Sequence, residues 1–311
     1  MHILDTCALQ SIPRARLVEA RGQRDIAIST ISFLEIFSHL EEAGKFDRVR
    51  GNVLKCQVPR MLHDPYAVHA ISCGLGSLLH PSRLEDKLLF ERVLEVLSQS
   101  NTLEEFYAQQ VQAPSGEMVS CQDAAGNTFR MLDEIQSEYV ESITIKAREI
   151  LINFSYAASD LIREEDMWTL ASNDIRNMTD GYLAALPEAD RPERRELLMR
   201  VGYSQFMRSV YDYYRAAHYL RAASSRTRLS SEEDVTPAVL HIDPNDCEDS
   251  MICMHLNIDT ANTLVTGDRR TLQALRFAKQ ALQNELRSSP LQFHIQSEQE
   301  FRDGLSQAEA A

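Results

Sequence analysis

Four acidic residues stand at points where the chain changes from a short apolar segment to a helical one, or near the start of a helical segment. They are Asp5, Glu35, Asp249 and Asp268. Clustered carboxylates repel one another unless a cation neutralises them, and such oxygen ligands suit Mg²⁺ or Mn²⁺. A bound ion of this kind activates water and stabilises negative charge on a phosphate. If the four acids converge, the chemistry they offer is metal-assisted hydrolysis.

Three of the four acids also have a purely structural explanation. Ser32 and Glu35 fit a capping box. Asp249 suits the first turn of a helix, and Asp268 could cap the helix that follows it. Asp5 differs, because an acid that ends an apolar strand at the start of a domain has no evident helix of its own to cap.

A basic and aromatic segment at residues 191–228 is the strongest candidate for contact with a polyanion. It holds nine arginines, three acids and five of the ten tyrosines. Arg208, Tyr211 and Arg215 share one helical face, and arginine forks with stacking rings are the groups that bind single-stranded RNA. The alternative is a helix whose tyrosines pack inward and whose arginines pair with acids elsewhere in the chain.

The two ends of the chain alternate between short apolar segments and helical ones. Strands are predicted at 2–5, 25–29, 239–242, 263–266 and 292–296, and helices at 14–24, 31–40, 248–258 and 269–279. This alternation is typical of an α/β domain with a parallel sheet. In such a sheet, strand carboxyl ends and helix N-termini meet at one edge, where acids from separate segments can converge.

The middle of the chain has a different pattern. Between about Gly44 and residue 229 the sequence is helical, with almost no strand signal, and helices are predicted at 84–97, 127–154, 165–183 and from Pro192. We therefore expect one α/β domain built from residues 1–45 plus 236–311, with a helical insertion at 46–235. Loop closure costs little per added residue, so a long insertion is tolerated.

The acid-bearing segments resemble the motifs of PIN-domain nucleases. The matching segments are Ile3-Leu4-Asp5-Thr6, Ser32-Phe33-Leu34-Glu35-Ile36, Glu248-Asp249-Ser250-Met251-Ile252-Cys253 and Leu264-Val265-Thr266-Gly267-Asp268. They occur in the order of that family. Each motif is short and is weak evidence alone, and the four motifs together are more specific for the family than any single motif.

The resemblance implies a PIN-like three-layer core with a central parallel sheet, interrupted by a large all-helical insertion. It implies a metal-dependent endoribonuclease that uses Mg²⁺ or Mn²⁺. Asp5, Glu35, Asp249 and Asp268 would then be the metal-binding and catalytic acids, Thr6 and Thr266 would orient ligands or water, and Asp246 or Glu248 could replace Asp249.

Two other functions stay open at this point. The core could be a PIN-like scaffold without catalysis, whose helical insertion binds a protein partner or a second copy of the chain. It could also be a nuclease that acts on DNA.

Composition sets the limits on all of these interpretations. The chain has 311 residues, 44% of them hydrophobic, and a net charge of −14. That charge argues against coating a nucleic acid along its length, but allows a local basic groove. The apolar runs are too short for a membrane span, and no signal peptide is evident. The six scattered cysteines suggest mostly buried, reduced thiols. We therefore expect a cytoplasmic protein with no membrane partner.

Overall fold

The chain folds into two compact units in the computed structural model, which describes residues 1–42, 44–78, 82–154, 164–257, 260–285 and 291–309. The sheet unit consists of Met1–Asp133, Thr260–Leu272 and Gln292–Ala311, and the helical unit of Glu134–Asp259 and Gln273–Leu291. Each unit is thus assembled from separate stretches of sequence.

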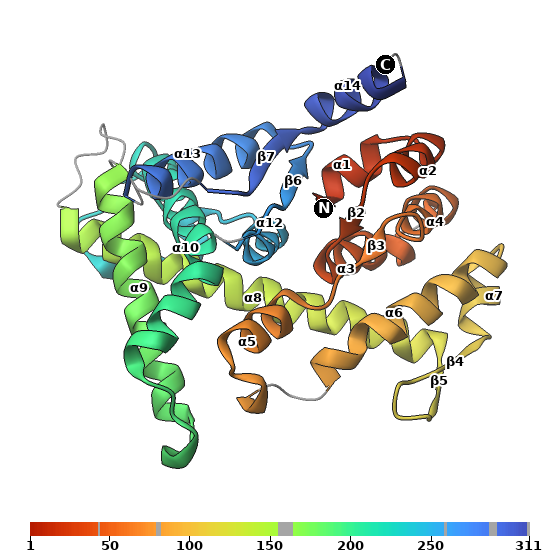
Figure 1. Ribbon diagram of the computed structural model, residues 1–311, viewed down its shortest axis with the longest axis horizontal. Helices are drawn as coiled ribbons and strands as arrows, with labels where there is room; N and C mark the ends of the chain where they lie inside the picture. Colours follow the sequence, from red (N-terminus) through yellow and green to blue (C-terminus); the bar gives the residue numbers. More distant parts are fainter. Residues whose placement is uncertain (43, 79–81, 155–163, 258–259, 286–290, 310–311) are drawn as a thin grey trace. The chain divides into compact units, whose positions relative to one another are not determined.

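A five-stranded, all-parallel sheet forms the centre of the sheet unit (Figure 1). Its strands run in the order β3 (Arg60–Met61), β2 (Ile26–Ile28), β1 (His2–Leu4), β6 (Thr263–Thr266) and β7 (His294–Ser297). The register pairs Leu4 with Ile28 on one side and with Val265 on the other. Both termini therefore contribute to one sheet, as the alternation predicts, and the α/β class is confirmed.

Short helices from the first 55 residues pack together beside the strands. They are α1 (Thr6–Ser11), α2 (Arg14–Gln23), α3 (Thr30–Ser38), the 3₁₀ turn η1 (His39–Glu41) and α4 (Phe46–Lys55). Helix α1 contacts β1, β6, α3 and α4. Phe33 and Phe37 on α3 are fully buried and stack on each other with ring centroids 5.2 Å apart, which anchors this helix in the core.

The sheet unit contains further elements besides the first turns of α8 (Cys121–Phe154) and α13 (Arg269–Glu285). They are α5 (Pro65–Cys73), η2 (Gly76–Leu78), α6 (Ser82–Gln99), α7 (Leu103–Tyr107), the hairpin β4 (Gln110–Gln112) and β5 (Met118–Ser120), and α14 (Glu298–Glu309). Arg50 on α4 and Gln57 just after that helix donate to backbone carbonyls of α6, which ties this part of the chain to α6. The guanidinium of Arg24, which follows α2, lies over the ring of Phe301 on α14, 5.4 Å from its centroid.

Long helices dominate the helical unit. Its elements are most of α8 (Cys121–Phe154), α9 (Glu164–Ala185), η3 (Glu188–Asp190), α10 (Arg194–Ser224), η4 (Glu232–Asp234), α11 (Pro237–Leu240), α12 (Asp246–Ile252), η5 (Cys253–His255) and most of α13 (Arg269–Glu285). Helix α10 contacts α9, α11, α12 and η5, so it is the central element of this unit.

Several predicted elements differ from the observed ones. The predicted strand at 239–242 is wrong, because Thr236 caps α11 and Pro237 occupies its first turn. The predicted insertion at 46–235 is not all-helical, since the short strands β3, β4 and β5 lie there. The helix predicted at 248–258 is observed as α12, which starts at Asp246 and ends at Ile252, followed by η5. Ile258, the last residue of the predicted helix, lies outside the described residues.

The two units also do not follow the predicted boundaries of 1–45 plus 236–311 and 46–235. Residues 46–133 belong to the sheet unit because β3 pairs with β2 and α6 packs on α4, whereas residues 236–259 belong to the helical unit. No helix within the described ranges is both long enough and apolar enough to cross a bilayer.

Candidate functional site

The order of the sheet strands creates a switch point between β1 and β6. From β1 the connections lead outward through β2 to β3 in one direction, and β6 and β7 lie on the other side. In open parallel sheets, ligands bind in the crevice outside the carboxyl ends of the strands at such a point. Asp5 follows β1 and Asp268 follows β6, so two of the predicted acids lie at this edge.

Asp5 joins the ends of the two central strands. The carboxylate is 1% exposed, and its Oδ1 accepts hydrogen bonds from the backbone N–H of Ala8 at 2.6 Å and of Gly267 at 3.4 Å. The bond from Ala8 makes Asp5 the N-cap of α1. The expectation that Asp5 has no helix to cap is therefore wrong, because α1 begins directly after β1.

Gly267 allows this close approach. A Cβ atom at this position would lie 3.1 Å from the carbonyl carbon of Cys7 and 3.2 Å from the backbone nitrogen of Ala8, closer than side-chain carbons normally come. The turn after β6 therefore lies directly against the first turn of α1. This contact holds the peptide that precedes Asp268 beside Asp5.

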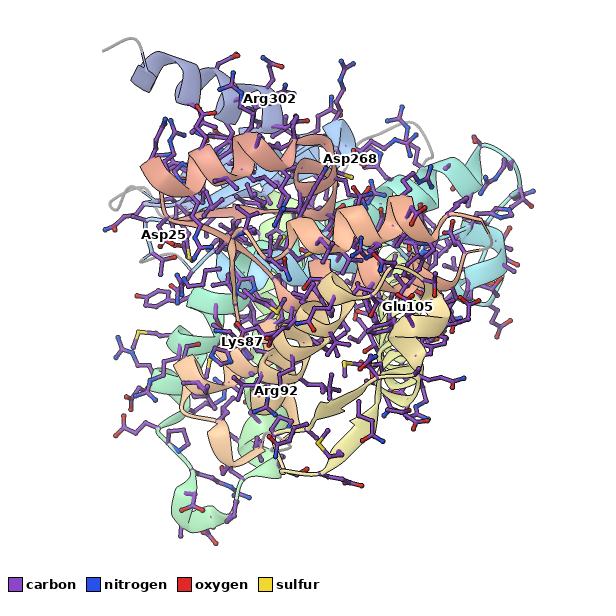
Figure 2. The ribbon with its side chains drawn as sticks, turned by 90° about the vertical axis from the view of Figure 1, so that its right-hand side faces the viewer. Asp25, Lys87, Arg92, Glu105, Asp268 and Arg302 are labelled. Atoms are coloured by element: carbon purple, nitrogen blue, oxygen red, sulfur yellow. The ribbon has the colours of Figure 1, made fainter. Side chains whose placement is uncertain are left out.

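Asp268 caps α13, as its structural explanation predicts. Its Oδ1 accepts from the backbone N–H of Arg270 at 2.6 Å and of Thr271 at 3.4 Å. Its own N–H donates to Oγ1 of Thr266 at 3.0 Å. The side chain is half-buried and labelled in Figure 2. Thr266 thus shapes the turn that carries Asp268.

Glu35 lies on α3, which packs against α1, and its Oε2 atom is buried. Ser29, and not Ser32, caps this helix, so the predicted capping box is wrong. Thr6 is 4% exposed in the first turn of α1. The sheet unit therefore supplies three of the four predicted acids and both predicted threonines.

Asp249 belongs to the helical unit, in the first turn of α12. Asp246 and Glu248, the two alternatives to it, lie in the same turn. Asn245 precedes the helix without a side-chain capping bond. Three acids at a helix N-terminus interact favourably with the helix dipole.

The predicted polyanion-binding face of α10 is turned toward α12. Tyr211 is fully buried, and its hydroxyl donates to Oδ2 of Asp249 at 3.4 Å. Arg215 donates from Nε to Oδ2 of Asp246 at 3.0 Å, and the hydroxyl of Tyr219 donates to the same oxygen. These contacts match the alternative in which tyrosines pack inward and arginines pair with acids.

Further polar contacts extend this buried network. Arg208 donates from Nε to Oγ of Ser250 at 3.2 Å and lies 3.7 Å from Oδ2 of Asp212. Burial raises the pKa of Asp212, and the positive charge of Arg208 partly offsets that effect. Burial also raises the pKa of Tyr211 well above its ordinary value, and the negative charge of Asp249 adds to the rise.

Within the residues that the structure describes, no group of three or more histidine, cysteine, aspartate or glutamate side chains is arranged to hold a metal ion. Magnesium is commonly held by only one or two carboxylates, and water and substrate phosphate complete its shell. Asp5 and Asp268 have the oxygen chemistry for such a minimal site. Asp5 accepts from the N–H of Gly267, the residue before Asp268, so these two acids are the candidates for such a site in the sheet unit.

A pocket beside this edge was missed by the sequence reasoning. It has a volume of about 620 Å³ and is lined by α1, α3, η1 and α4, including Cys7, Ile36, His39, Lys45 and Arg48. The signal that could have found it is the pair of basic residues Lys45 and Arg48, directly after the second predicted helix. The pocket lies entirely within the sheet unit.

The chain was compared with models of known protein families, with curated proteins and with solved structures, and none of the three comparisons found a match.

Proposed function

We propose that this chain is a PIN-like nuclease that hydrolyses phosphodiester bonds of RNA with the help of Mg²⁺ or Mn²⁺. The observation that carries the proposal is the meeting of Asp5 with the Gly267–Asp268 turn at the switch point of an all-parallel sheet. The order of the acidic motifs in the sequence supports the same activity. A three-layer PIN-like core is part of the proposal.

In this proposal Asp5 and Asp268 hold the divalent ion, and Glu35 is the third acid of the sheet unit. The ion supplies a positive charge for the phosphate and lowers the pKa of a water molecule. The protein groups keep the carboxylates in place. Backbone N–H groups hold Oδ1 of Asp5 and of Asp268, and Thr266 fixes the turn between them. Asp249 remains a sequence prediction as the fourth acid.

Cleavage of a labelled single-stranded RNA with Mn²⁺ tests the proposal. Asp5→Asn keeps an oxygen that can accept from Ala8 and Gly267, so the fold is retained while the carboxylate charge is lost. We expect a larger fall in cleavage rate than the roughly 10–100-fold cost typical of an outer-shell partner. Asp268→Asn should behave alike.

Asp25→Asn is the matched control, because Asp25 is an exposed acid just before β2. It should leave the rate unchanged. Unchanged cleavage by Asp5→Asn would contradict the proposal, as would activity that survives removal of divalent ions by a chelator. A DNA oligonucleotide of the same sequence separates an RNA nuclease from a DNA nuclease.

The second candidate is a PIN-like scaffold without catalysis, and one observation favours it. Asp5 and Asp268 each cap a helix, so both acids have a structural role without a metal. The partner would be a protein or a second copy of the chain. Calorimetric titration with Mn²⁺ separates the candidates, because the nuclease requires binding that Asp5→Asn weakens and the scaffold requires none.

A further inference from the structure

The pocket beside the acidic edge adjoins the proposed catalytic groups along the chain. Cys7 follows Asp5 and Thr6 on α1, and Ile36 follows Glu35 on α3. Its volume of about 620 Å³ lies within the range of roughly 300–1,000 Å³ that is typical of small-ligand sites. A ligand seated there would contact α1, which Asp5 caps, and α3, which carries Glu35.

The charges in this pocket are unequally compensated. Glu42 pairs with Nζ of Lys45 and with Nδ1 of His39, each at 2.5 Å. These hydrogen bonds, that of Lys45 first, lower the pKa of Glu42, so its carboxylate stays ionised. Arg48 is exposed and has no hydrogen-bond or ion-pair partner among the described residues. The pocket thus has one uncompensated cation and a second that is shared with an acid.

Neutral polar groups and apolar surface complete the lining. Gln10 and Asn52 present amides, which can both donate and accept hydrogen bonds. Ile36 and Val49 are buried core residues whose edges reach the pocket wall. A lining of cations, amides and aliphatic carbon fits a ligand with a phosphate, a polar base edge and an apolar ring face. An acidic peptide would use the cations but leave the amides and the apolar wall unexplained.

We propose that this pocket binds one nucleotide of a single-stranded RNA, with its phosphate at Arg48 and Lys45 and its base against Ile36 and Val49. The inference rests on the proposed function and names its substrate subsite. Arg48 supplies a forked donor for phosphate oxygens, and Lys45 a point charge. Glu42 holds Lys45 at the pocket rim.

Cys7 gives a direct reporter of occupancy. It lines the pocket and is exposed, whereas the other five cysteines are buried. Burial raises the pKa of Cys56 to about 12 and that of Cys121 to about 11, which suppresses their reactive thiolate forms. A thiol reagent should therefore label Cys7 first. The kinetic phase of labelling that disappears in Cys7→Ser is the phase that belongs to Cys7.

The experiment measures the rate of Cys7 labelling against the concentration of a ten-nucleotide oligouridylate, with a chelator present so that no RNA is hydrolysed. We expect the RNA to slow labelling, and Arg48→Gln to raise the concentration for half-protection about tenfold or more, as the loss of a charge-assisted hydrogen bond predicts. The matched control is Arg302→Gln, an exposed arginine on α14 that is labelled in Figure 2, and it should change nothing.

Four results would overturn the inference, and the first three are no protection by RNA, protection that Arg48→Gln leaves unchanged, and equal protection by a polyglutamate peptide. Equal protection by uridine monophosphate at the same concentration would also overturn it, because the site would then take a free nucleotide. Labelling needs no catalysis, so the two proposals fail separately. Protection without cleavage refutes only the nuclease, and cleavage without protection refutes only the pocket.

Discussion

Some residues that are proposed to take part in catalysis also stabilise the fold. Asp5 is the clearest case, because one oxygen of its carboxylate caps α1 and contacts the turn after β6. A capping carboxylate contributes about 1 kcal/mol to stability. The same bonds fix the carboxylate at the sheet edge, as a preorganised ligand requires. Structural and chemical roles are therefore compatible at this residue, and substitution by asparagine separates them.

His255 sets a pH dependence of stability in the helical unit. It is 6% exposed, and burial lowers its pKa from 6.5 to about 4. The folded state favours the neutral ring, so its stabilising effect is complete above pH 6.5 and is lost as the pH falls toward 4. Relative to His255→Gln, we expect the wild type to lose on the order of 2 kcal/mol between pH 7.5 and pH 5.

Urea unfolding followed by the fluorescence of Trp168 measures this difference. Trp168 is the single tryptophan, and it packs on Phe206 within the helical unit, 4.3 Å between ring centroids. The difference between the two proteins removes the titration of groups that they share. Parallel stability profiles from pH 7.5 to pH 5 would show that His255 is not buried as a neutral ring.

At the scale of elements, α10 holds α12 through buried polar contacts. Arg215 and Asp246 have side chains only 10% and 15% exposed, and their ion pair is joined by Tyr219. Removing one partner leaves a buried charge without compensation, which typically costs about 3–5 kcal/mol. We expect Arg215→Met to destabilise the helical unit by an amount of that order, measured by the Trp168 fluorescence transition in urea.

Arg194→Met is the control for this prediction, because Arg194 forms a bidentate pair with Asp180 on the surface, where both side chains are more than half exposed. Exposed pairs contribute little, so the transition should hardly move. Adding Asp246→Asn to Arg215→Met should restore part of the lost stability. Equal effects of the Arg215 and Arg194 substitutions would contradict a buried clamp.

Element types were predictable from sequence where the pattern was long or the strand fully buried. The strand Thr263–Thr266 is confirmed, and the helices at 84–97, 127–154 and 165–183 are confirmed with longer observed bounds. Strand β3 was not predictable, because two residues carry no period and Arg60–Met61 becomes a strand only by pairing with β2.

The site was predictable to a lesser degree than the fold. The sequence placed Asp5 and Asp268 at strand ends, and the parallel sheet brings those ends together. Helix α1 was missed because six residues are too few for an amphipathic pattern, so the capping role of Asp5 was missed as well. The orientation of Arg215 toward Asp246 depends on tertiary packing, which helical spacing alone does not specify.

At the scale of the whole molecule, the net charge of −14 leaves few cations for a polyanion. The nine arginines of residues 191–228 are the largest basic group, yet six of them already bond to acids, a serine or backbone carbonyls. An RNA bound along α10 and an RNA bound in the pocket beside α4 would therefore differ in the number of phosphates that the protein neutralises.

The salt dependence of RNA binding measures that number. Each phosphate contact to a single strand contributes about −0.7 to the slope of log K against log salt concentration. The single phosphate held by Lys45 and Arg48 predicts a slope of about −0.7 for the wild type and a slope closer to zero for Arg48→Gln. Fluorescence anisotropy of labelled oligouridylate between low and physiological salt, with a chelator present, supplies both slopes. If all nine arginines of residues 191–228 bound phosphates, the slope would instead approach about −6 and would barely respond to Arg48→Gln. A steep slope of that kind would show that the RNA binds the arginine-rich segment at 191–228 and not the pocket. RNA binding would then be assigned to the helical unit.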